Sequence, residues 1–202
     1  MNQYLANLGF VVLSVNYRLG IGYGYDFHNP KSAGQWGASE YLDIKAAGEW
    51  LAQQSFVDSK KIGIYGGSYG GFVTLMSLFQ HPDAFACGAA LRSVTDWAHY
   101  NHEYTSNILN YPETDAEAYR KSSPIYFAEG LKKPLLMLHG MVDDNVQFQD
   151  IVRLQQRLIE LGKIDWELAA YPVEEHGFKE AYSWFDEYRR ILNLFDKHLA
   201  KP

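Results

Sequence analysis

The stretch KIGIYGGSYGG, residues 61–71, begins as a β-strand and ends with Ser68 surrounded by glycines. A nucleophile on a sharp strand-to-helix turn must point its side chain into a cleft, which strains the backbone and leaves no room for neighbouring Cβ atoms. The pattern Gly-x-Ser-x-Gly meets this need, and the apolar run FVTLMSLF, residues 72–79, follows as a helix whose N-terminus faces the serine. The pattern comprises Gly66, Ser68 and Gly70, with Gly67 and Gly71 beside them. The stretch therefore predicts a nucleophilic serine on a strand-to-helix turn.

Glycines after a strand also occur in loops that bind dinucleotide phosphates. That fingerprint requires glycine where Ser68 stands, and no Gly-Lys-Ser/Thr follows here. The second glycine cluster, GIGYG at 20–24, lacks the last glycine of the dinucleotide pattern because Tyr25 occupies its place. We expect this second cluster to be a flexible turn and the protein to use no cofactor.

Along the chain, apolar runs rich in β-branched residues alternate with segments of helical period. This alternation is typical of an α/β fold in which helical crossovers join the strands of a mostly parallel sheet. The predicted strands are residues 10–16, 61–65, 85–91, 134–139 and 166–171. The predicted helical faces are Ile44, Ala47 and Leu51; Ile151, Leu154, Leu158 and Leu161; and Trp184, Tyr188, Ile191, Phe195 and Leu199. With 202 residues, the chain suits a single domain.

The composition excludes several classes of partner. The formal net charge is −6, with acidic and basic residues mixed along the chain, so neither nucleic acid nor an anionic membrane is expected to bind. Cys87 is the single cysteine, which rules out an internal disulfide. No leader or long apolar run occurs, so the chain as given is expected to be soluble, with its compartment left open because a signal could precede it.

A serine hydroxyl is a weak nucleophile at neutral pH, so it needs a histidine base, and the histidine needs an acid to orient it. The loop MVDDNV after the fourth predicted strand holds Asp143 and Asp144, and the loop PVEEHGF after the fifth holds His176. Open parallel sheets bind ligands at the carboxyl ends of their strands, where both loops lie. The order Ser, Asp, His is that of the α/β-hydrolase fold, which we therefore predict.

The remaining histidines are assigned no chemistry. His139 precedes a turn glycine and is expected to be structural; His81, His99, His102 and His198 lie in segments without strand-end placement. No HExxH motif or Cys/His ligand spacing occurs, so no metal is expected.

Residues 93–124 lack a clear period and are rich in aromatic, Asn, Thr and acidic residues. The segment is too long for an ordinary connection, so we expect a lid or substrate-binding loop.

Taken together, GGSYGG, HGMVDDNV and EEHGF resemble the prolyl oligopeptidase family of serine peptidases, in members like dipeptidyl peptidase IV and acylaminoacyl peptidase, over nearly the whole chain. The resemblance implies Ser68 as nucleophile, His176 as base and Asp143, the first acid of the pair, as the residue that orients His176. The backbone N–H of Tyr69 is implied as one oxyanion donor.

The run VTDWAHYNHEYTSNI, residues 94–108, is similar to the substrate pocket of dipeptidyl peptidase IV-like members. An aromatic box of this kind suits proline or another compact apolar side chain before the cleaved bond. The same resemblance implies that Asn145 holds a substrate carbonyl. The implied pocket residues are Val94, Trp97, Tyr100 and Tyr104.

In the family, a β-propeller domain, a sheet strand and the loop with the second oxyanion donor precede the part that this chain resembles. The resemblance therefore implies a catalytic-domain piece, residues 1–202, that hydrolyses short peptides, with the propeller or a second copy of the chain as partner. Two alternatives stay open: a carboxylesterase-type hydrolase, because the triad does not choose between ester and amide, and a catalytically silent fragment that acts only by association.

Overall fold

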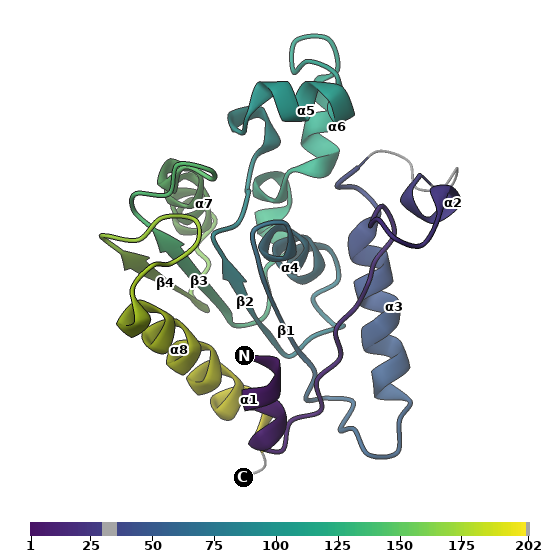
Figure 1. Ribbon diagram of the computed structural model, residues 1–202, viewed down its shortest axis with the longest axis vertical. Coiled ribbons are helices and arrows are strands. Elements are labelled where there is room, and N and C mark those ends of the chain that lie inside the picture. The colour runs from purple at the N-terminus through teal and green to yellow at the C-terminus, as the bar shows by residue number, and fades with distance from the viewer. Residues whose placement is uncertain (30–35, 201–202) are drawn as a thin grey trace.

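The computed structural model describes residues 1–29 and 36–200. Its sheet has four parallel strands in the order β1-β2-β3-β4, and helices flank it (Figure 1). The strands are β1 (Gly63–Gly67), β2 (Cys87–Leu91), β3 (Leu135–Gly140) and β4 (Trp166–Tyr171). The helices are α1 (Asn2–Asn7), α2 (Tyr25–His28), α3 (Glu40–Ala52), α4 (Tyr69–Gln80), α5 (His102–Leu109), α6 (Ala116–Ser122), α7 (Phe148–Glu160) and α8 (Ala181–Leu199), with 3₁₀ segments η1 (Trp97–His99) and η2 (Pro124–Gly130). The predicted α/β class is confirmed.

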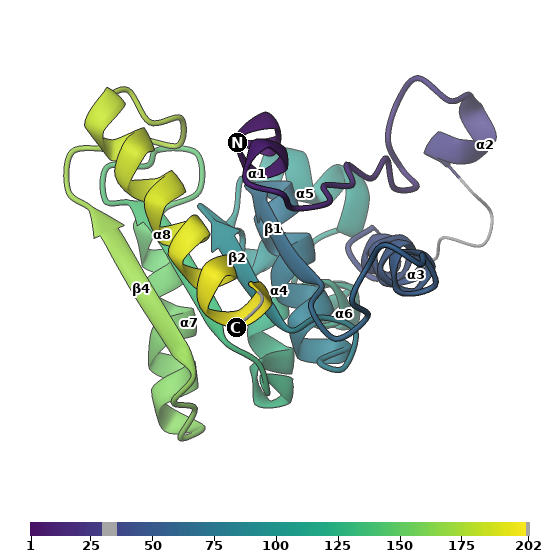
Figure 2. The same cartoon turned by 90° about the horizontal axis from the view of Figure 1, so that it is seen from below.

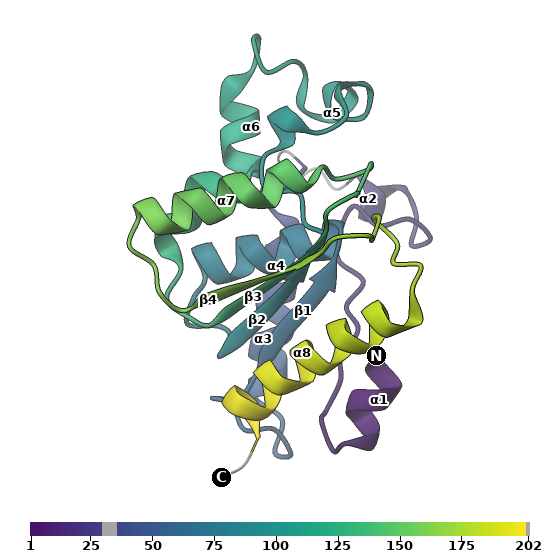
Figure 3. The same ribbon diagram turned by 90° about the vertical axis from the view of Figure 1, so that its left-hand side faces the viewer.

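The two faces of the sheet are covered by different helices. Figure 3 shows α4 and α7 on one face and α1 and α8 on the other. Side chains of a strand alternate between faces, so Ala90 of β2 joins the α4 and α7 side while Ala89 joins the α8 side. Both faces are therefore apolar, as the near-continuous hydrophobic sequence of the strands predicts.

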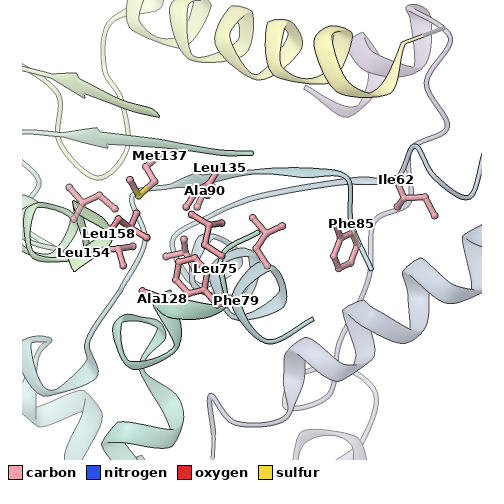
Figure 4. Packing of buried hydrophobic residues seen from close by; sticks show 13 residues of the cluster. Ile62, Leu75, Phe79, Phe85, Ala90, Ala128, Leu135, Met137, Leu154 and Leu158 are labelled. Carbon is pink, nitrogen blue, oxygen red and sulfur yellow. The ribbon is translucent and has the colours of Figure 1, made fainter. Parts of the chain in front are cut away.

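The larger core lies between the sheet and the helices α4 and α7 (Figure 4). Leu75 of α4 and Leu154 of α7 are fully buried there against Met137 of β3. Leu154 and Leu158 lie one helical turn apart, which is the spacing that predicted this buried face. The crossovers α4 and α7 thus fix the strand ends from which the loops at the candidate site begin.

The predicted strand at residues 10–16 is wrong. These residues form extended chain that runs alongside the sheet beyond β1 without pairing with it (Figures 1 and 2). An apolar groove of about 670 Å³, lined by Val11, Leu13, Ile64 and other residues, separates this segment from β1. A strand needs a neighbour that accepts and donates ladder hydrogen bonds, and within the described residues the outer edge of β1 has none.

Residues 93–124 are largely helical rather than an irregular loop. They contain η1, α5 and α6, which project from one end of the molecule (Figure 1). A side chain caps the N-terminus of both α5 and α6. Asn101 Oδ1 accepts from Tyr104 N at 3.2 Å, and Asp115 Oδ1 accepts from Ala118 N at 3.2 Å. Tyr119 packs with Val94, Trp97 and Leu109 against α4, so the segment is anchored on the core beside the site.

Candidate active site

Ser68 lies between β1 and α4 with φ 57° and ψ −118°, a left-handed conformation that is strained for a residue with a Cβ atom. Its backbone N–H donates to Leu91 O at 2.9 Å, which ties the turn to the end of β2. Only glycine fits at position 71, because a Cβ atom there would lie 2.6 Å from the backbone carbonyl oxygen of Leu91. The glycines of the motif thus allow the close packing that holds the strained turn.

The structure brings Ser68, His176 and Asp143 together from three different loops. Ser68 Oγ lies 2.9 Å from His176 Nε2, and His176 Nδ1 lies 2.8 Å from Asp143 Oδ2. Because the carboxylate can only accept, Nδ1 carries the proton and Nε2 is left to accept from the serine hydroxyl. The arrangement is that of a nucleophile, a base and a group that orients the base.

Asp143 is almost fully buried and fully hydrogen-bonded. Its Oδ1 accepts from the backbone N–H groups of Asn145 and Val146, both at 2.9 Å, and its Oδ2 also lies 3.3 Å from His139 Nε2. Burial alone would raise the pKa of Asp143, but hydrogen bonds from His139, His176 and Val146 hold it well below its usual range. The carboxylate therefore stays ionised beside His176.

Asp144 and His139, the other titratable groups near Asp143, differ in burial and in hydrogen bonding. His176 bonds to Asp143 and not to Asp144, which is exposed. His139, which the sequence predicts to be structural, is fully buried, and its Nε2 lies 2.9 Å from Val146 O. The imidazole of His139 thus braces the loop that presents Asp143.

The loop that presents His176 is closed by Glu174. The carboxylate of this buried residue accepts from the backbone N–H groups of Lys179 at 2.7 Å and Glu180 at 3.3 Å. Its carbonyl oxygen would lie 2.2 Å from a Cβ atom on Gly140, so the loop packs directly on the end of β3. Glycine at the end of β3 therefore lets the histidine loop approach the loop that carries Asp143.

Tyr69 is the first residue of α4, so its backbone N–H has no acceptor within the helix. Its hydroxyl donates to Glu40 Oε1, and the fully buried Glu40 also accepts from Gly37 N at 2.8 Å and Ser39 N at 3.1 Å. Burial, followed by the charge of Glu40, raises the pKa of the Tyr69 hydroxyl, which therefore remains a donor. Sequence reasoning missed Glu40, since its partner lies 29 positions away.

The four residues implied as a substrate pocket lie in three different environments. Trp97 and Tyr104 stack with ring centroids 6.2 Å apart and line a small apolar pocket. Tyr100 lies beside them, but its hydroxyl donates to Asn145 Oδ1 at 2.6 Å and both line a neighbouring polar cleft. Val94 is buried in the core against α4. Tyr69, expected only as an oxyanion donor, also lines this pocket. Sequence reasoning missed the other lining residues, which are Trp36, Gly37, Thr105, Ile108 and Leu109.

In residues 1–29 and 36–200, no three His, Cys, Asp or Glu side chains gather so as to hold a metal ion. No helix in this part of the chain is both long and apolar enough to cross a membrane.

Comparison with curated proteins finds dipeptidyl peptidases. The chain is 34% identical over 190 residues to dipeptidyl aminopeptidase BIII of Pseudoxanthomonas mexicana, covering 88% of this chain and 27% of that protein. It is also 34% identical over 202 residues to dipeptidyl peptidase 4 of Sus scrofa, covering 98% and 26%. The chain thus spans about a quarter of the length of these relatives.

Among solved structures, dipeptidyl peptidase 4 of Porphyromonas gingivalis superimposes with a TM-score of 0.82 at 31% identity, over 87% of this chain and 25% of that chain. The four-stranded parallel sheet and its helices therefore belong to an α/β-hydrolase fold. The family model described as "Prolyl oligopeptidase family" matches residues 1–202. This chain is accordingly a member of the prolyl oligopeptidase family of serine peptidases.

Proposed function

We propose that this chain hydrolyses peptide bonds of short peptides through an acyl-enzyme, with Ser68 as nucleophile, His176 as general base and acid, and Asp143 as the residue that orients His176. The observation that best supports this proposal is the continuous chain of hydrogen bonds from Ser68 Oγ through His176 to the buried Asp143 carboxylate. Membership of the prolyl oligopeptidase family supports the peptidase assignment.

In the proposed reaction, Ser68 Oγ attacks the peptide carbonyl carbon while His176 Nε2 takes the hydroxyl proton. The backbone N–H of Tyr69 donates to the oxyanion that forms. When the C–N bond breaks, His176 returns its proton to the leaving amine and the acyl group stays on Ser68. Water, activated by His176, then hydrolyses the ester and regenerates the serine.

We further propose that the residue before the cleaved bond is proline or a small apolar residue. The pocket beside Tyr69 is small, apolar and bounded by the stacked rings of Trp97 and Tyr104, which suits a compact ring. Asn145, held by Tyr100, offers a side-chain amide for a substrate carbonyl next to this pocket. The residues 93–124 act here as the wall of the substrate site.

Intact mass after exposure to a fluorophosphonate tests the nucleophile. The reagent forms a bond between a serine oxygen and phosphorus with loss of fluoride, and it requires an activated hydroxyl. We expect one adduct on the parent, one on a Ser59→Ala control, whose serine is exposed, and none on Ser68→Ala. A folded parent without an adduct would contradict the proposal and favour the silent, associating fragment.

A substrate panel then tests the reaction class. Peptide amides with proline, alanine or aspartate before the scissile bond are compared with short acyl esters, and product masses show whether dipeptides are released. Cleavage of the proline and alanine amides supports a peptidase. Turnover of esters with none of amides would replace it by a carboxylesterase.

A further inference from the structure

Arg92 has unusual backbone angles that hydrogen bonds hold in place. It follows β2 directly, and its φ of 41° is left-handed, as is that of Ser68. Its N–H donates to Leu138 O at 2.7 Å, while the preceding carbonyl, Leu91 O, accepts from Ser68 N at 2.9 Å. Residues with a Cβ atom hold such angles only where the surrounding structure fixes them, and these cluster at functional sites.

The Arg92 side chain lies between the two segments that carry Ser68 and His176. On one side its Nη2 would lie 3.0 Å from a Cβ atom on Gly67, the residue before the nucleophile. On the other side its guanidinium lies 5.9 Å from the ring centroid of Phe178, which is two positions after His176. Trp184 of α8 covers the same guanidinium at 5.4 Å. Two cation–π contacts restrict where the guanidinium can lie.

Glu187 of α8 forms an ion pair with this guanidinium. Its Oε2 lies 3.4 Å from Arg92 Nη1, and its side chain is 0% exposed. Its other oxygen, Oε1, has no hydrogen-bond partner among the described residues. The charged and titratable groups that face Glu187 are Arg92 after β2, Glu174 in the histidine loop and Tyr171 at the end of β4.

We propose that Arg92, held by Glu187, is a positioning residue that keeps the turn of Ser68 and the loop of His176 at hydrogen-bonding distance from each other. This inference rests on the proposed function, since it assigns the pair a role in that reaction. Neither residue touches the reacting atoms; both act through Gly67 and Phe178. With Glu187 ionised, the ion pair fixes the guanidinium in place. With Glu187 protonated, only the cation–π contacts with Phe178 and Trp184 remain.

Burial raises the pKa of Glu187 to about 7, with Glu174 adding to the rise and Arg92 opposing it. Glu187 therefore changes from neutral to charged near pH 7, within the pH range of the assays. The ionisation of Glu187 should then add to the pH dependence of the reaction. The parent rate should rise with pH more steeply than the rate of a variant in which residue 187 cannot ionise.

The test compares the fluorophosphonate labelling rate between pH 5 and 9 for the parent, Glu187→Gln, Arg92→Met and Arg92→Lys. Asp186→Asn is the matched control, because it removes a carboxylate paired with Arg190 on the same helix without touching Arg92. We expect Glu187→Gln and Arg92→Met to be labelled about ten- to a hundredfold more slowly, as expected for a misplaced nucleophile. The rate of Glu187→Gln should also rise less steeply with pH than that of the parent. Arg92→Lys keeps the charge but not the planar guanidinium, so it should recover only part of the rate.

Labelling rates and pH slopes like those of the parent in Glu187→Gln would overturn the inference. A second measurement serves if a variant fails to fold or the parent is never labelled: ¹⁵N NMR of the His176 ring in the parent, followed against pH. We expect those resonances to show an inflection from the ionisation of Glu187 at about pH 7, and its absence would also overturn the inference. A parent that shows the inflection yet takes no label would instead contradict only the proposed function.

Discussion

The α-carbon of Gly66 faces the backbone of Gly70 so closely that a Cβ atom on Gly66 would lie 2.6 Å from the Gly70 carbonyl. The reverse does not hold, because a Cβ atom on Gly70 would meet no atom within 4 Å. Gly70 borders the open groove beside β1. The two glycines that flank Ser68 in the motif are therefore unequal in this structure.

We expect Gly66→Ala to abolish labelling of Ser68 and to lower the free energy of unfolding by about 1–3 kcal/mol, because the clash is with backbone that cannot rotate away. Gly70→Ala should fold normally, helped by the higher helix propensity of alanine, about 1 kcal/mol, within α4. Urea unfolding and fluorophosphonate labelling of the two variants measure this contrast. Equal damage from both would mean that the turn is not packed as described.

The residues of the candidate site could be predicted because each carries a local signal. Ser68 stands in a pattern that only a strained turn requires, and Asp143 and His176 each follow a buried strand. Parallel strands present their carboxyl ends at one edge of a sheet, so strand-end placement alone predicts that these residues meet. The choice between Asp143 and Asp144 came from the family resemblance. In the structure the two differ in burial, because the Asp143 carboxylate is buried and the Asp144 carboxylate is exposed.

What could not be predicted depends on distant neighbours. Residues 10–16 have the composition of a strand, but a strand also needs a partner, which a local pattern does not reveal. The helices α5 and α6 are too short for a clear period and rely on caps and packing against α4. Arg92 and Glu187 are 95 positions apart, so their pairing has no signature in the sequence.

We expect Tyr104→Ala to weaken peptide cleavage without unfolding the chain. The Tyr104 side chain is 43% exposed, and its ring stacks on Trp97 at the pocket wall. An aromatic contact contributes about 0.5–1.5 kcal/mol, so kcat/KM for a proline substrate should fall about two- to tenfold. Tyr182→Ala, which removes an exposed ring on α8, is the control and should change nothing. Equal kcat/KM in Tyr104→Ala and the parent would remove Tyr104 from the substrate site.

Glu187 should make stability fall as pH rises through neutrality. Its pKa is raised in the folded chain, so folding favours the protonated form; the stabilisation is complete below the unfolded value of 4.5 and lost as pH rises through about 7. The shift corresponds to at most about 3 kcal/mol. Urea unfolding from pH 5 to 8 should therefore be flatter for Glu187→Gln than for the parent. Asp186→Asn should keep the parent slope, because the pKa of Asp186 is lowered and its titration lies below this range.

Asp143→Asn and Asp144→Asn should differ sharply in turnover. An asparagine at 143 would donate to His176 Nδ1 rather than accept from it, which favours the wrong tautomer and removes the charge that stabilises the imidazolium. By analogy with other serine peptidases, kcat should fall about ten-thousandfold. Asp144 is exposed and does not contact His176, so its variant should stay within a few-fold of the parent. Peptide hydrolysis at pH 8 measures both, and comparable losses would mean that Asp143 does not orient the base.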